Sequence, residues 1–225
     1  QAIDLISDLY LNPIFDKAEI EKEKGVIIEE LNMYEDMPQR KIGDIFLHLL
    51  YGDQPAGWDV GGEKDIIRIL TKEDFVAYRA KHYLPQATTV IVAGAFDEAS
   101  VLAQLEKLFG GMTPGTKANK LTVIEQQSVP AVFIKHKQSD QSHLMLGFRA
   151  FSMFDPRQYT LEVLADILGG GMSSRLFHKV REELGAAYYV NASADLYTDH
   201  GYIAAGAGVE HSKLEIVIRA IVAEF

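Results

Sequence analysis

The sequence contains no cysteine. This absence excludes disulfide bonds, thiolate metal sites and cysteine nucleophiles, although it leaves the redox compartment undetermined. Any metal ion would have to be held by histidine, aspartate or glutamate side chains. The sequence also lacks His-x-x-Glu-His and His-Glu-x-x-His, and no two of its seven histidines are spaced as a pair of helical ligands; they lie at positions 48, 82, 136, 143, 178, 200 and 211.

Long apolar runs and basic blocks are missing as well. No run approaches the length of about 18 residues that a membrane-spanning helix needs, and no charged leader typical of a signal peptide begins at Gln1. The 22 lysines and arginines are outnumbered by 32 aspartates and glutamates, which gives a formal net charge of -10. Binding to a phosphate backbone requires a basic surface, so we expect no nucleic-acid partner, and instead peptides or small molecules. Because long apolar runs are missing, we also expect no membrane span.

The ends of the sequence indicate a piece of a longer protein. It does not start with methionine, and it stops inside the apolar periodic run 214–225 without a helix-stop signal. With 48% hydrophobic residues in 225 positions, the chain can still bury a substantial core. We therefore expect a globular fragment.

Two glutamates are candidates for metal chemistry. Glu23 and Glu30 are seven residues apart in a stretch with helical periodicity, so both lie on one helix face, about 10 Å apart along the axis. They are too distant to share one ion, so one would bind the metal and the other would orient a neighbouring ligand. A solvated acidic helix face is the alternative, and the adjacent Glu29 projects about 100° away.

The first half of the chain carries clear signals for helices. Residues 17–50 show helical periodicity that is interrupted by Pro38. Thr71 and Asp74 form a capping-box pattern, which predicts a helix that starts near Lys72.

A strand and a further helix are expected after residue 87. The β-branched and apolar segment 88–95 predicts a buried strand, and Asp97 is placed to cap a helix over 98–109. The Gly- and Pro-containing segment 110–120 is the clearest linker in the chain.

The order of elements changes after this linker. Strands joined by both hairpins and helices indicate an α+β fold with helices packed on largely antiparallel sheets. We expect two units, 1–113 and 128–225, separated by a linker at 114–127. The second unit should contain strands at 130–136, 143–150, 188–193 and 202–209, and helices at 156–168 and 173–184.

Several short motifs follow one another in an order and spacing that is specific when taken together. They are Glu23-x6-Glu30, Pro55-x-Gly57, Gly61-Gly62, Leu70-Thr71-x-x-Asp74, Tyr83-Leu-Pro85, the segments 92–97 and 168–177, and Arg181 with Tyr188 in the segment 181–188. Over nearly its whole length the chain resembles the insulinase and pitrilysin family of zinc peptidases, the inverzincins, to which the mitochondrial processing peptidases also belong.

The resemblance implies two homologous α+β units and a zinc-dependent metalloendopeptidase that hydrolyses peptide bonds with a metal-activated water. In the family, zinc is bound by the two histidines of His-x-x-Glu-His and by a downstream glutamate, which corresponds to Glu30. Glu23 corresponds to an accompanying acid that orients a ligand. Arg181 and Tyr188 match substrate-binding positions, where a guanidinium can bind a carbonyl and a hydroxyl can stabilise an oxyanion. The alternative for Arg181 is a charge at a helix C-terminus.

The missing His-x-x-Glu-His limits what the resemblance implies for this chain alone. One carboxylate cannot replace three ligands, so we expect zinc in the intact parent protein, and an inactive fragment that does not hold catalytic zinc by itself. Expected partners are peptide or small protein substrates, and a homodimer or a partner subunit. The alternative function is a non-catalytic family subunit that serves as a structural or substrate-presenting partner.

Overall fold

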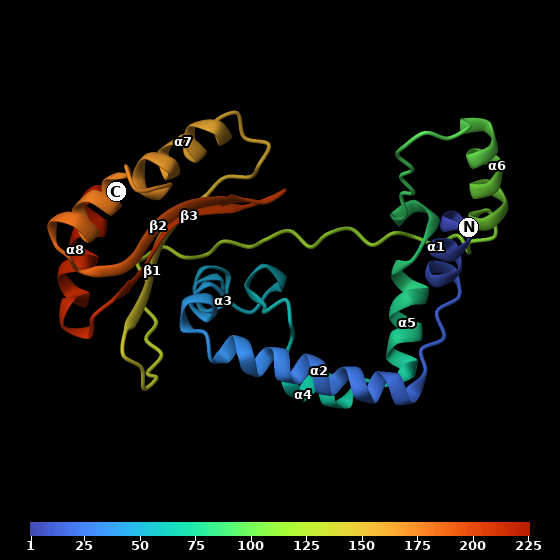
Figure 1. Cartoon of the computed structure of the whole chain (residues 1–225), viewed down its shortest axis with the longest axis horizontal. Helices are drawn as coiled ribbons and strands as arrows, with labels where there is room; N and C mark the ends of the chain where they lie inside the picture. Colours follow the sequence, from blue (N-terminus) through green and yellow to red (C-terminus); the bar gives the residue numbers. More distant parts are fainter. The chain divides into compact units, whose positions relative to one another are not determined.

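Helices and one antiparallel sheet make up the computed structural model, which describes residues 1–225 (Figure 1). The α+β class predicted from the sequence is confirmed. The strands are β1 (Ser142–Ala150), β2 (Ala187–Leu196) and β3 (Gly201–Val209). The α-helices are α1 (Ala2–Leu11), α2 (Lys17–Glu35), α3 (Pro38–Tyr51), α4 (Lys64–Ile69), α5 (Lys72–His82), α6 (Glu98–Phe109), α7 (Gln158–Gly169) and α8 (Leu214–Glu224). Shorter elements are the 3-10 helices η1 (Pro55–Gly57), η2 (Pro85–Ala87) and η4 (His211–Lys213), and the π-helix η3 (Phe177–Glu183).

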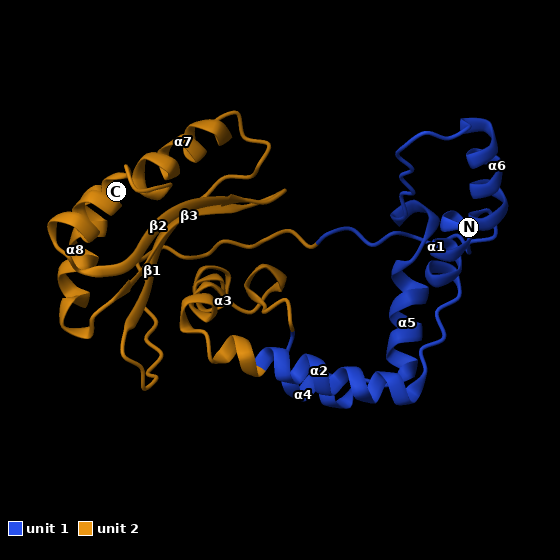
Figure 2. Ribbon diagram, in the orientation of Figure 1, with its two compact units in different colours: residues 1–31, 62–120 blue, residues 32–61, 121–225 orange.

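The chain forms two compact units, which Figure 2 shows in different colours. Unit 1 consists of Gln1–Leu31 and Gly62–Lys120, and unit 2 consists of Asn32–Gly61 and Leu121–Phe225. The chain first enters unit 2 within α2 and enters it for the last time after Lys120, inside the predicted linker 114–127. The predicted domains 1–113 and 128–225 stay a prediction.

Unit 1 is helical, and α5 and α6 begin where the sequence predicts. Thr71 accepts a hydrogen bond from the backbone N–H of Asp74, and the Asp74 carboxylate accepts one from the backbone N–H of Thr71, which completes the capping box of α5. The pKa of Asp74 is lowered because its carboxylate accepts a hydrogen bond from the Thr71 hydroxyl and another from the Thr71 backbone N–H. Asp97 caps α6 by accepting a hydrogen bond of 2.8 Å from the Ser100 N–H. The first N–H groups of α5 and α6 have no partner within their helices, and local side chains thus satisfy some of them.

Two predicted strands are not formed. The segments 88–95 and 130–136 carry no ladder, and Ile91 and Val132 each keep 83% of their surface exposed. Their β-branched composition favours extended backbone, but a strand also needs a neighbour for its N–H and C=O groups. No other segment of residues 1–225 pairs with either of them.

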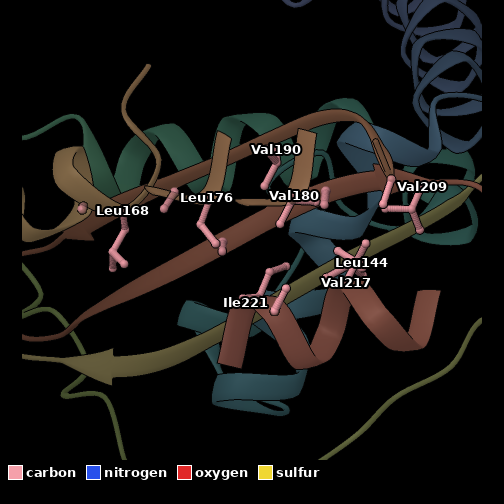
Figure 3. Close-up of a cluster of buried hydrophobic side chains, with 14 of the residues drawn as sticks. Leu144, Leu168, Leu176, Val180, Val190, Val209, Val217 and Ile221 are labelled. Carbon is pink, nitrogen blue, oxygen red and sulfur yellow. The ribbon is translucent and has the colours of Figure 1, made fainter. Parts of the chain in front are cut away.

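Unit 2 is built on a sheet with the strand order β1-β3-β2, in which β3 pairs antiparallel with both neighbours. Alternate residues of β3 point to one face, where α7, α8 and η3 cover them. The resulting core contains fully buried leucine, isoleucine and valine side chains (Figure 3). The labelled members are Leu144, Leu168, Leu176, Val180, Val190, Val209, Val217 and Ile221.

The opposite face of the sheet is covered at one end by α3. Phe46, Leu50 and Tyr51 of this helix pack against Tyr202 and Ala204 of β3. Because successive residues of a strand point to opposite faces, this second cluster is separate from the main core. The part of this face near Gly208 lies beyond the α3 cluster.

Two helix boundaries show the effect of local sequence. α2 ends at Glu35 and α3 starts with Pro38, as the predicted interruption requires, because proline lacks the N–H that a helix interior needs. The helix predicted over 173–184 forms largely as the π-helix η3 over Phe177–Glu183. The hydrogen bond from the Leu184 N–H to the Lys179 carbonyl spans five residues, which is the π-helical pattern.

Candidate functional site

Glu23 and Glu30 lie on the uninterrupted helix α2, and both side chains are exposed. Neither side chain takes part in a hydrogen bond or an ion pair, in contrast to Glu21 on the same helix, which pairs with Lys24 at 2.7 Å. Their roles as an orienting acid and a zinc ligand stay predictions. The helix nevertheless presents Glu30 as a free carboxylate, which is what an additional metal ligand must be.

The chain by itself does not offer a complete metal site. No group of three or more histidine, aspartate or glutamate side chains is arranged to hold a metal ion. A tetrahedral zinc site needs at least three protein ligands, so the residues of this chain do not fit zinc on their own. A zinc site that included Glu30 would need further ligands from other polypeptide.

Arg181 and Tyr188, seven residues apart, are brought together in unit 2. A guanidinium N–H of Arg181 donates a hydrogen bond to the backbone carbonyl of Tyr188. The same guanidinium lies over the ring of Phe177, with 5.5 Å between Cζ and the ring centroid. Arg181 also lies in the last turn of η3, where a positive charge interacts favourably with the helix dipole, so its position is compatible with the alternative role as well. One of its five N–H donors is engaged, and the others are available to a ligand.

The backbone is irregular at both residues. Arg181 lies in a π-helix, and Tyr188 lies at a β-bulge, because Ala187 pairs with Val209 while Tyr189 pairs with Gly208. Tyr188 therefore has no partner on β3, and its side chain is 58% exposed. π-helices and β-bulges both occur preferentially near functional sites, where they redirect side chains.

A pair of residues that sequence reasoning missed lies directly beside Tyr188. His143 Nδ1 and the Tyr189 hydroxyl are 2.9 Å apart, and the two rings stack with centroids 5.9 Å apart. Burial lowers the pKa of His143 and raises the pKa of Tyr189, because it disfavours both charged forms. Only the strand register brings these residues together, and the sequence carries no short-range signal for this register.

Unit 1 contains an apolar cavity of about 810 Å³ between α1 and α5. Leu9, Phe15, Phe75 and Tyr78 are among its lining residues. The Arg79 guanidinium closes one side by donating hydrogen bonds of 2.8 and 2.6 Å to the carbonyls of Tyr10 and Leu11. The cavity contains none of the predicted site residues.

Residues 70–225 match the sequence model of a family described as the peptidase M16 inactive domain. An uncharacterized zinc protease of Rickettsia felis is 34% identical over 230 residues, which cover 100% of this chain and 54% of that protein. An uncharacterized zinc protease of Bacillus subtilis is 33% identical over 214 residues, which cover 95% of this chain and 52% of that protein. The chain thus spans about half the length of the curated relatives it matches.

Solved structures share the fold at lower sequence identity. The peptidase M16 inactive domain from Pseudomonas fluorescens is 21% identical with a TM-score of 0.80, and the match covers 99% of this chain and 55% of that one. A protease from Helicobacter pylori is 22% identical with a TM-score of 0.81, and the match covers 92% of this chain and 51% of that one. No helix combines the length and the apolar character that crossing a membrane requires.

Proposed function

Because this chain belongs to the peptidase M16 family, the insulinase and pitrilysin family that its motifs resemble, we propose that it is part of a zinc-dependent metalloendopeptidase. In this proposal Glu30 is one zinc ligand, Glu23 orients a neighbouring ligand, and Arg181 and Tyr188 bind the peptide substrate. The histidine ligands come from polypeptide outside this sequence, in the same protein or in a partner subunit. Residues 1–225 are inactive on their own.

The contact between Arg181 and Tyr188 is the observation that carries the proposal. It fixes a guanidinium with free donors against the backbone carbonyl of a residue whose phenol is exposed, and both residues lie on irregular stretches of backbone. The guanidinium can bind a carbonyl or carboxylate of a peptide, and the phenol can donate a hydrogen bond to an oxyanion as charge develops on it. Such an arrangement suits acyl chemistry on peptides or small proteins.

A second function is a non-catalytic subunit that supports an active partner. The observations that favour it are the description of the matching family model as an inactive domain and the lack of a metal-binding cluster in this chain. Under this alternative, Arg181 and Tyr188 would present substrate to a zinc site on another subunit. Loss of Glu30 would then leave the zinc content unchanged.

Zinc content separates the two functions. In the intact protein that contains this chain, Glu30→Gln should reduce bound zinc and peptidase activity, since it removes an anionic ligand. Glu29→Gln is the matched control, because this exposed neighbour projects away from the Glu23 and Glu30 face. Metal content would be measured by atomic spectroscopy, and activity with a fluorogenic peptide library. Equal zinc in Glu30→Gln and wild type would reject Glu30 as a ligand.

A further inference from the structure

The side chain of Tyr189 bridges all three strands of the sheet. Both His143 on β1 and Tyr189 on β2 are register partners of Gly208 on the central strand β3. A Cβ atom at position 208 would lie 2.3 Å from Cε1 of Tyr189, so the tyrosine ring passes directly over this glycine. The hydroxyl then reaches His143 Nδ1 on the far strand. Glycine at 208 is what leaves room for this bridge.

The bridge fixes the backbone immediately after the bulged residue. Tyr188 has no ladder partner, and pairing resumes at Tyr189 opposite Gly208. A bulged residue is held only by its flanking pairs, because its own backbone groups lie outside the ladder. On the N-terminal side this flank is Ala187 opposite Val209. On the C-terminal side it is the Tyr189 ring, held by its contact with Gly208 and by its hydrogen bond to His143.

We infer that His143 and Tyr189 are positioning residues that hold the β-bulge in the conformation in which Tyr188 is exposed and its carbonyl accepts the Arg181 hydrogen bond. Neither residue needs to contact substrate. The catalytic consequence rests on the proposed function, since it requires that Arg181 and Tyr188 bind substrate. The structural consequence, a bulge held by the bridge, does not depend on it.

Four substitutions in the intact protein separate the bridge from general packing. Tyr189→Phe keeps the ring and removes the hydroxyl, and His143→Leu removes the partner of that hydroxyl. His143→Asn is the conservative variant, because its side-chain amide places a hydrogen-bonding atom near the position of Nδ1. Gly208→Ala pushes the ring off the central strand.

Gly206→Ala is the matched control for Gly208→Ala. This glycine lies two residues earlier on the same strand and face, and a Cβ there would approach only Asn191 Oδ1 at 3.2 Å and the Leu144 carbonyl at 4.0 Å. It therefore leaves the bridge intact. The comparison isolates displacement of Tyr189 from the general effect of adding a methyl group to β3.

Hydrogen exchange measured by mass spectrometry on peptides covering residues 184–192 tests the structural step. We expect faster exchange in Tyr189→Phe, His143→Leu and Gly208→Ala, because loss of the bridge allows local opening. Exchange in His143→Asn and Gly206→Ala should match wild type. Unchanged exchange in both Tyr189→Phe and Gly208→Ala overturns the inference, whatever the activity of the protein.

Steady-state kinetics on a peptide substrate tests the catalytic step. Tyr189→Phe and His143→Leu should lower kcat about tenfold or more with little change in KM, because misplacing a transition-state donor costs rate more than binding. His143→Asn should restore most of kcat. Faster exchange with unchanged kcat overturns the positioning role and leaves the proposed function standing. An inactive wild-type protein contradicts the proposed function, and the exchange data alone then decide whether the bridge holds the bulge.

Discussion

The backbone carbonyl of Tyr188 accepts a hydrogen bond from the side chain of Arg181, so the side chain of a residue in η3 is fixed against the backbone of a residue in β2. The loop between η3 and β2 is short, and this hydrogen bond links the residues on either side of it. A change in the path of this loop therefore moves the guanidinium and the phenol together.

Tyr188→Phe should lower kcat of the intact protein about a hundredfold, since loss of one oxyanion donor typically has an effect of this size. The free energy of unfolding should change by less than about 0.5 kcal/mol, because the side chain is 58% exposed and its hydroxyl has no partner. Peptidase kinetics and urea unfolding measure the two effects. Tyr159→Phe on α7, another exposed tyrosine, is the control for both. Unchanged turnover would remove Tyr188 from the site.

Gly185→Ala should destabilise the protein by about 1 kcal/mol, because the backbone of Gly185 has φ of +52°, in the left-handed region. Space is not the reason, since no atom lies within 4 Å of a Cβ at this position. Gly185→Asn should cost less, because asparagine tolerates the left-handed region better than alanine does. Urea unfolding of the two variants gives the comparison. Equal stability of all three proteins would show that the loop adopts another backbone conformation at no cost.

Ile221→Ala should lower the free energy of unfolding by about 2 to 5 kcal/mol, because the side chain is fully buried between α8 and the sheet. Val222→Ala on the same helix is the matched control: its side chain is 54% exposed, so we expect a change within about 0.5 kcal/mol. Denaturant unfolding monitored by circular dichroism measures both. Similar losses for the two variants would contradict the described orientation of α8.

The stability of the protein should fall as the pH drops below about 6.5, in part because of His143. Burial holds its folded-state pKa below the ordinary value, so at mildly acidic pH the unfolded chain binds more protons than the folded one. The stabilising contribution is complete above the unfolded-state pKa and is lost as the pH falls towards the folded-state pKa. Urea unfolding from about pH 8 to pH 5 tests this. His143→Asn cannot titrate and should show a smaller loss; an identical pH profile would disprove the assignment.

Elements with local signals could be predicted from the sequence. The caps at Thr71 and Asp97 lie within three residues of the groups they bind, and the break at Pro38 follows from the missing N–H of that residue alone. The β2–β3 hairpin also needs only a short turn between two strand-like segments. In each case the deciding interaction is close in sequence.

The features that escaped prediction depend on residues far apart in the chain. Whether the segment 88–95 becomes a strand depends on a neighbour that its own composition does not specify. The contact between His143 and Tyr189 requires the register of two separate strands on β3, and the bulge at Tyr188 shifts that register by one residue. An exposed Glu30 is compatible with a metal ligand and with a solvated acid, and the zinc content of Glu30→Gln distinguishes the two.

The unpaired segment 88–95 also affects how the protein behaves at high concentration. It contains β-branched and apolar residues with no charge and no proline, and its backbone N–H and C=O groups are not engaged in a sheet. A stretch of this kind is a template onto which an identical stretch of another molecule can add as a strand. We therefore expect intermolecular β-pairing to limit the solubility of residues 1–225, and Ile91→Lys at this exposed position to reduce such pairing.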